Sequence, residues 1–90
     1  MAQAIIDPVE LRRFALNLKQ FINELRERIA ALHGQMLSLG DTWRDQEHEK
    51  FAQEFEQTMH VLAAFLEHAD QQIPFLVRKA ERVEEYMSQR

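Results

Sequence analysis

The side chains most able to do chemistry in this sequence are four histidines and fifteen carboxylates. The histidines are His33, His48, His60 and His68. No two of them stand four residues apart, the spacing that would place two ring nitrogens on one face of a helix. Glu56 and His60 do have that spacing, which keeps a metal-binding helical bundle as an alternative for metal analysis to test. We expect no metal site and interpret the histidines as solvated surface residues.

The carboxylates do not form a catalytic pattern. Acid–base catalysis requires two such groups in a pocket that separates their pKa values. Six acids lie between residues 41 and 56, against two bases, which is typical of a solvated helix face. Cysteine is absent, so a thiol nucleophile, a disulfide and a zinc knuckle are all excluded. Two glycines cannot form a glycine-rich nucleotide loop, so we expect neither an enzyme nor a cofactor.

The charge and hydropathy of the chain exclude two further classes of partner. A formal net charge of −4 is not that of a nucleic-acid-binding protein. No run approaches the roughly 18 apolar residues of a membrane helix, so we expect no membrane insertion. The N-terminal residues lack the basic start and apolar stretch of a signal peptide. We expect a chain that folds in the cytoplasm and whose export, if any, uses no cleavable leader.

The first half of the chain predicts a helix over residues 8–39. Asp7 can cap it, Pro8 suits its first position, and Glu10 stands three residues after the cap. Apolar residues recur along it in steps of three and four, which gives the helix an apolar stripe. They are Leu11, Phe14, Leu18, Phe21, Leu25, Ile29, Leu32, Met36 and Leu39. Gly34 costs roughly 1 kcal/mol inside a helix, but the stripe continues on both sides of it.

The second half predicts a turn at 40–44 and a helix at about 45–88. Gly40 suits the position after the first helix, and either Thr42 or Asp45 can cap the second. Pro74 interrupts one backbone hydrogen bond, so we expect a kink there. The apolar residues of this helix follow a heptad pattern. They are Phe55, Met59, Leu62, Leu66, Ala69, Ile73, Leu76, Ala80, Val83 and Met87, with Phe51, Val61, Phe65 and Tyr86 beside them.

Together the two elements predict a single all-α domain, an antiparallel helix-turn-helix hairpin. At equal rise per residue, Pro74 would lie near the start of helix one. Residues 77–90 would then overhang the hairpin, and Val83, Tyr86 and Met87 could recognise a partner.

A lone hairpin of this length buries a small core, and its apolar stripes are wider than one seam requires. We therefore expect dimerisation into a four-helix bundle, either as a homodimer or as a heterodimer with a paralogous hairpin. The expected bundle seam combines apolar residues from both helices. They are Phe14, Leu18, Phe21, Leu25, Ile29, Leu32, Phe55, Met59, Leu62, Phe65 and Leu66.

At the turn, Leu39, Trp43 and Phe51 have the spacing of a family motif. With this layout the sequence resembles the WXG family of small helical hairpins, the early-secreted-antigen-like proteins of type VII secretion. The resemblance identifies Leu39, Gly40, Trp43, Asp45 and Phe51 as the turn motif. The sequence departs from the family at Asp45, which takes the place of the glycine in Trp-x-Gly.

The resemblance implies a non-enzymatic substrate or chaperone-like partner of a type VII secretion system that acts through its helix faces. A secretion ATPase is a further implied partner, with Trp43 either presented to it or closing the end of the bundle. Family members often carry Tyr-x-x-x-Asp/Glu after helix two, whereas here Arg90 follows Tyr86 by four. The alternative function is that of a cytoplasmic coiled-coil adaptor or structural helical bundle unrelated to secretion.

Overall fold

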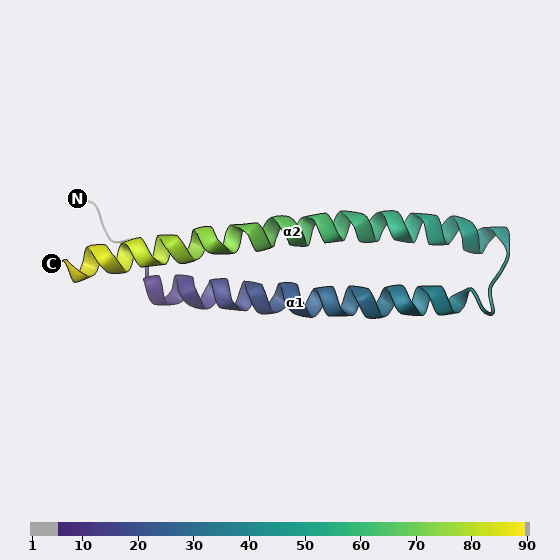
Figure 1. Ribbon diagram of the computed structural model, residues 1–90, viewed down its shortest axis with the longest axis horizontal. Helices are drawn as coiled ribbons and strands as arrows, with labels where there is room; N and C mark the ends of the chain where they lie inside the picture. Colours follow the sequence, from purple (N-terminus) through teal and green to yellow (C-terminus); the bar gives the residue numbers. More distant parts are fainter. Residues whose placement is uncertain (1–5, 90) are drawn as a thin grey trace.

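Two long helices lie side by side in the chain, which is seen here as a computed structural model that describes residues 6–89 (Figure 1). Helix α1 spans Pro8–Leu39 and helix α2 spans Gln46–Ser88, and the two run antiparallel in a rod of 69 × 20 × 16 Å. Residues 6–89 contain no strand and no apolar helical stretch of membrane-spanning length. Residues 1–5 and Arg90 lie outside the described part, and so do the expectations about a leader and about Arg90.

The start of α1 is closed by the cap that the sequence predicts. The Asp7 backbone is extended, and its side chain accepts a hydrogen bond of 2.9 Å from the Val9 amide. Pro8 follows at the first helical position, where its missing N–H is not needed. The helix continues through Gly34 to Leu39.

The end of α1 differs from the usual glycine cap. Gly40 has φ −61° and ψ −17°, which is right-handed, and no described residue has a positive φ. The Gly40 amide donates to the Leu37 carbonyl at 3.1 Å, and Asp41 and Thr42 repeat this tight pattern. The chain therefore leaves α1 through a tightened last turn, and the left-handed conformation that glycine permits is not used.

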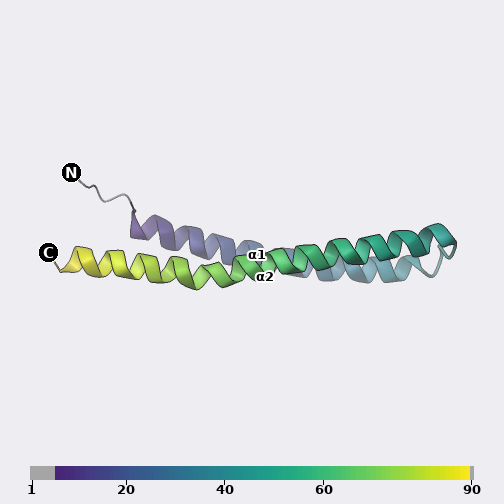
Figure 2. The same ribbon diagram turned by 90° about the horizontal axis from the view of Figure 1, so that it is seen from above.

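Asp45, and not Thr42, caps α2. Its side chain accepts a 3.0 Å hydrogen bond from the His48 amide, and Glu47 and Glu49 follow in the first turn, where the helix dipole favours negative charge. Beyond this start, α2 is one uninterrupted helix that includes Pro74. Figure 2 shows α2 as gently curved along its length, and a kink at Pro74 itself stays a prediction.

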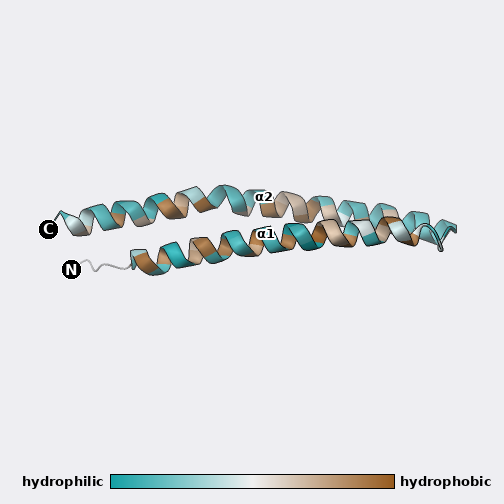
Figure 3. Cartoon of the chain, turned by 60° about the horizontal axis from the view of Figure 1, so that its bottom comes forward, coloured by the Kyte–Doolittle hydropathy of each residue, from teal (hydrophilic) through white to brown (hydrophobic). Residues whose placement is uncertain are grey.

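The core is a narrow line of small and medium side chains between the helices. On α1, Ala15, Ile22 and Met36 are buried, with intervals of one or two heptads between them. On α2, Leu66 and Ala80 are buried, two heptads apart. This line lies one position away from Phe14 and Phe21 of the expected stripe, which are 55% and 52% exposed. Apolar positions recur along the full length of both helices in Figure 3. Many of these side chains are more than two-fifths exposed, so much apolar surface lies outside this line.

The overhang of α2 is shorter than the sequence predicts. Ala80 is fully buried and Val77 is half-buried, and Glu84 forms an ion pair with Arg12 near the start of α1. The expected start of the overhang at residue 77 was therefore wrong. The reason is visible at the turn, where α2 begins beyond the end of α1, so that the two helices are staggered (Figure 1).

Candidate functional site

Ion pairs cross between the helices along one side of the hairpin. The bases Arg12, Lys19, Arg26 and His33 follow one another at intervals of seven on α1, so they share one face. Their partners on α2 are Glu84 for Arg12, Asp70 for Lys19, Asp70 and Glu67 for Arg26, and Glu56 for His33. We call this set the ion-pair ladder.

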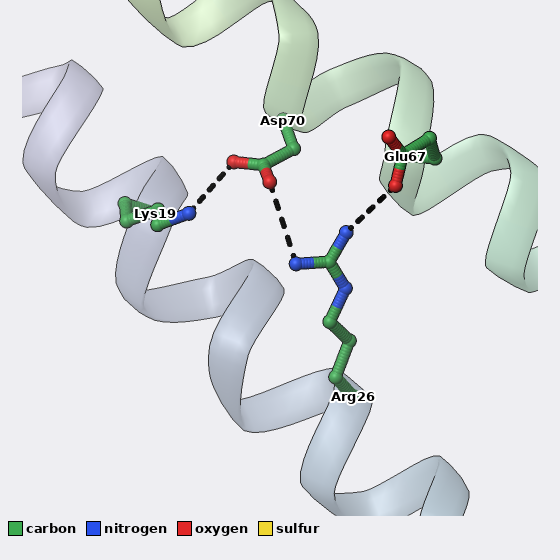
Figure 4. Close-up of polar contacts among 4 residues, drawn as sticks. All are labelled: Lys19, Arg26, Glu67 and Asp70. Atoms are coloured by element: carbon green, nitrogen blue, oxygen red, sulfur yellow. Dashed lines mark hydrogen bonds and ion pairs between the residues drawn. The ribbon is translucent and has the colours of Figure 1, made fainter.

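The middle of the ladder is a shared carboxylate (Figure 4). Lys19 Nζ lies 2.9 Å from one oxygen of Asp70, and Arg26 Nη1 donates to the other at 3.4 Å. The second nitrogen of the Arg26 fork reaches Glu67 at 3.3 Å. The hydrogen bond from Lys19, together with the neighbouring charges of Lys19 and Arg26, lowers the pKa of Asp70.

Arg12 and Glu84 form the ladder's pair at the end of the hairpin away from the turn. Arg12 donates from Nε and Nη2 to the two oxygens of Glu84, each at 2.9 Å, in the two-pronged geometry of a good arginine–carboxylate pair. The hydrogen bond and the attraction lower the pKa of Glu84 and raise that of Arg12. Both side chains remain about two-fifths exposed, so water screens the pair.

The opposite side of the hairpin is apolar and open. An open groove of about 490 Å³ lies between the helices there, with Phe14 and Leu18 of α1 on one wall. The other wall belongs to α2 and consists of Phe65, His68, Ala69, Gln72, Phe75 and Leu76. We call Phe14, Leu18, Phe21, Phe65 and Phe75 the phenylalanine face, because Phe21 follows Phe14 by one heptad. Its four phenylalanines are each more than half exposed.

At the turn, Trp43 packs on the start of α2. Its ring meets His48 edge-on with centroids 5.0 Å apart, and it lies 6.0 Å from Phe51, which in turn lies 6.0 Å from Phe55. Trp43 is half-buried in this row. Arg44, the middle residue of the motif, points back to the end of α1 and donates to the Gly40 carbonyl at 3.1 Å.

A second, smaller hollow lies next to this aromatic row. It is lined by Leu32, Met36 and Leu39 of α1 and by Phe51 and Phe55 of α2. Leu39 and Phe51, both predicted as parts of the turn motif, therefore face one another across this hollow. Both are more than two-fifths exposed.

The histidines are less uniform than the sequence suggests. His33 Nε2 lies 2.5 Å from Glu56, so Glu56 is engaged across the hairpin and not with His60 on its own helix. The expectation of surface histidines was wrong for His48, which packs on Trp43 and whose Nε2 is enclosed without a hydrogen-bond partner. Over residues 6–89, no three histidine, aspartate or glutamate side chains are grouped as metal ligands would be.

The residues of the expected bundle seam differ in how far their side chains are buried. Leu66 is the one fully buried member of this set. The half-buried members are Leu18, Leu25, Ile29, Phe55, Met59 and Leu62, and the exposed ones are Phe14, Phe21, Leu32 and Phe65. In the tail, Val83 is half-buried, whereas Tyr86 and Met87 are 69% and 51% exposed.

Two features were missed by sequence reasoning, the ion-pair ladder and the core position of Ala15. The spacing of residues in the sequence contained a signal for both features. Bases recur at 12, 19 and 26 with His33 next, and Ala15, Ile22 and Met36 share one heptad position beside them. Alanine carries a weak hydrophobic signal, and basic residues near acids were interpreted only as surface charge.

The comparison with known families decides what kind of hairpin this is. Residues 3–86 match the family described as proteins of 100 residues with WXG. The chain belongs to the WXG100 family. It does so with Trp43-Arg44-Asp45 at the motif, where Asp45 supplies the N-cap of α2 in place of the family's glycine.

A solved structure supports the same assignment for the fold. The crystal structure of a glycine-to-alanine mutant of the secreted protein EsxB from Bacillus anthracis, strain Sterne, is 30% identical to this chain, with a TM-score of 0.80. The match covers 93% of this chain and 97% of the EsxB chain. Comparison with curated proteins gives no match. This WXG100 protein is thus an all-α hairpin that resembles EsxB over nearly its whole length.

Proposed function

We propose that this WXG100 protein is a non-enzymatic substrate or chaperone-like partner of a type VII secretion system. Its family and its likeness to the secreted protein EsxB support this proposal. In this proposal the chain acts by presenting helix faces to other proteins, and the exposed phenylalanine face carries the argument.

The proposed mechanism is pairing with a second hairpin into a four-helix bundle. The chain exposes 7455 Å² of surface, whereas a globular chain of its mass exposes about 5,500 Å². A stable interface buries about 800 Å² on each partner, so the excess of the hairpin is ample for one. The phenylalanine face is the part of this surface where burial would gain most. The second hairpin is either another copy or a paralogous chain.

The rest of the proposal concerns the ends of the rod. The row formed by Trp43, Phe51 and Phe55 would support the turn from within, and exposed Tyr86 and Met87 at the end of α2 would meet other components such as a secretion ATPase. The chain would be made in the cytoplasm and exported from there.

Export is the direct test. A tagged chain is expressed in a bacterium with a type VII system and in the same strain without its secretion ATPase, and the culture medium is assayed for the tag. Appearance of the chain in the medium only when the ATPase is present supports the proposal. Retention in both strains, with the partner hairpin co-expressed, contradicts it and favours the coiled-coil adaptor.

A further inference from the structure

Trp43 lies in the short stretch of chain between the helices, where neither helix fixes the direction of its side chain. Its amide is bound to the end of α1, because it donates to the Leu39 carbonyl at 2.9 Å. Its ring instead lies against the start of α2, with its centroid 5.0 Å from that of the His48 ring. Trp43 is therefore attached to one helix by its backbone and to the other by its side chain.

His48 is the contact that best accounts for this placement of the indole. The two rings meet at 72°, the edge-on arrangement that aromatic pairs prefer. Phe51 lies farther from Trp43, at 6.0 Å, and is 43% exposed. The His48 ring also borders Gly40, because a Cβ added to that glycine would lie 3.9 Å from His48 Cε1. The imidazole thus occupies the space between Trp43 and the end of α1.

The position of His48 is itself fixed by the cap of α2. Its amide donates to the Asp45 side chain at 3.0 Å and to the Asp45 carbonyl at 3.1 Å. These two hydrogen bonds hold the His48 backbone in the first turn of the helix. Asp45 is also the residue at which this sequence departs from its family. The cap, the imidazole and the indole therefore form one series of contacts that begins at that departure.

The imidazole acts here through packing and not through a hydrogen bond. Its Nε2 is enclosed and has no hydrogen-bond partner among residues 6–89. A polar atom in this state costs free energy in the folded chain. An apolar ring of similar size should therefore replace His48 without loss of the packing on Trp43, which makes the role of the imidazole testable.

We propose that His48 is the positioning residue of Trp43, and that it fixes the surface that the turn presents to the secretion machinery. The inference rests on the proposed function and deepens it by naming the residue that shapes the turn. Trp43 is half-buried, so part of its indole faces outward. With His48 in place, this exposed part has one direction relative to the helices. Without His48 the indole can turn, because the more distant Phe51 is the aromatic ring that remains beside it.

The test uses the fluorescence of Trp43, which is the only tryptophan of the chain and so reports on its own surroundings. The emission wavelength and the quenching by acrylamide are measured at about pH 8, where histidine is uncharged. We expect His48→Ala to shift the emission to longer wavelength and to increase the quenching, while circular dichroism shows that the helices are retained. The ratio of folded to unfolded chain should fall by up to about tenfold, which corresponds to the loss of one aromatic pair.

Two further variants separate the packing of His48 from a general effect of substitution. His48→Phe retains a ring at this position without the enclosed nitrogen, so it should keep the emission and the quenching of the unmodified chain. His60→Ala is the matched control, because His60 is an exposed histidine about three turns farther along α2. It should leave the surroundings of Trp43 unchanged.

Export connects the placement of Trp43 with the proposed function. In the strain that has the secretion ATPase, His48→Ala should reach the medium in smaller amounts than the unmodified chain. His48→Phe should restore export, because it restores the ring that holds the indole. His60→Ala should be exported as the unmodified chain is.

The outcomes that overturn the proposal are distinct from those that overturn the proposed function. Emission and quenching that His48→Ala leaves unchanged overturn the positioning role, and so does a His48→Phe variant that behaves as His48→Ala does. Full export of His48→Ala, with its Trp43 emission shifted, overturns the link to the secretion machinery. If the unmodified chain itself is not exported, the proposed function fails, and the fluorescence still decides whether His48 positions Trp43.

Discussion

Arg12 and Glu84, 72 positions apart in the sequence, form a two-pronged ion pair with both distances at 2.9 Å. This pair joins the start of α1 to the last turns of α2. We expect Glu84→Arg to cause a small decrease in Tm, because exposed pairs are weak, and the exchange Arg12→Glu with Glu84→Arg to restore it. Molar salt should reduce the difference. Equal Tm values for the single and exchanged variants would show that the pair contributes nothing.

The ladder predicts how stability depends on acid. Pairing lowers the pKa values of Asp70 and Glu84 in the folded chain, so the unfolded chain binds protons at a higher pH. The stabilisation is present above the ordinary carboxyl pKa of about 4 and is lost as the pH falls through the lowered values. Urea unfolding at a series of pH values measures this loss. The variant Asp70→Asn should be less stable at neutral pH and show a shallower decline, and an unchanged slope would contradict the prediction.

Asp45 stabilises α2 by capping it, according to its hydrogen bond with the His48 amide. We expect Asp45→Ala to lower the free energy of unfolding by about 1 kcal/mol and Asp45→Asn to leave it nearly unchanged. Asp45→Gly, which recreates the Trp-x-Gly motif, should cost only a few tenths of a kcal/mol, since glycine also caps well. Urea unfolding followed by circular dichroism provides the comparison. A loss of similar size in Asp45→Asn would exclude capping as the reason.

Gly34 is a place where the protein can be stabilised. It lies inside α1, and a Cβ added there would meet no atom within 4 Å. Gly34→Ala should raise the free energy of unfolding by about 0.5–1 kcal/mol, because alanine loses less conformational entropy in a helix. Gly40→Ala is the control, since its Cβ would lie 3.3 Å from the Leu37 carbonyl oxygen. It should gain less, and an equal gain at both sites would show that the helical context is irrelevant.

The phenylalanine face should carry any pairing of hairpins. Phe65 is 61% exposed and lines the groove, so Phe65→Glu should give a helical monomer, because a charge would have to enter the apolar interface. Leu37 is 66% exposed and follows Leu16 by three heptads, on the side of the ladder. Leu37→Glu is therefore a matched control that should keep the mass of the unmodified chain. If Leu37→Glu alone dissociates the dimer, the interface lies on the ladder side.

Much of this fold was predictable because it depends on local chemistry. Asp7, Pro8 and Asp45 mark helix starts through hydrogen bonds to amides a few residues away, and the spacing of apolar residues predicts two helices and their pairing. The motif residues Leu39, Trp43 and Phe51 likewise come together through the short turn. Composition alone excludes whole classes of chemistry, because the chain has no cysteine and only two glycines.

Tertiary structure decided which side of each stripe faces inward and how the helices are staggered. Phe14 and Ala15 are neighbours in sequence, yet Ala15 is buried and Phe14 is exposed. Periodicity places both near the apolar stripe, but only the approach of α2 selects between them, and a small side chain allows the closer approach. The same approach chooses the ladder partners, because a base on α1 can reach acids on successive turns of α2. The sequence by itself therefore determined two amphipathic helices and their caps, and the packing of one helix on the other determined the core, the ladder and the face left open.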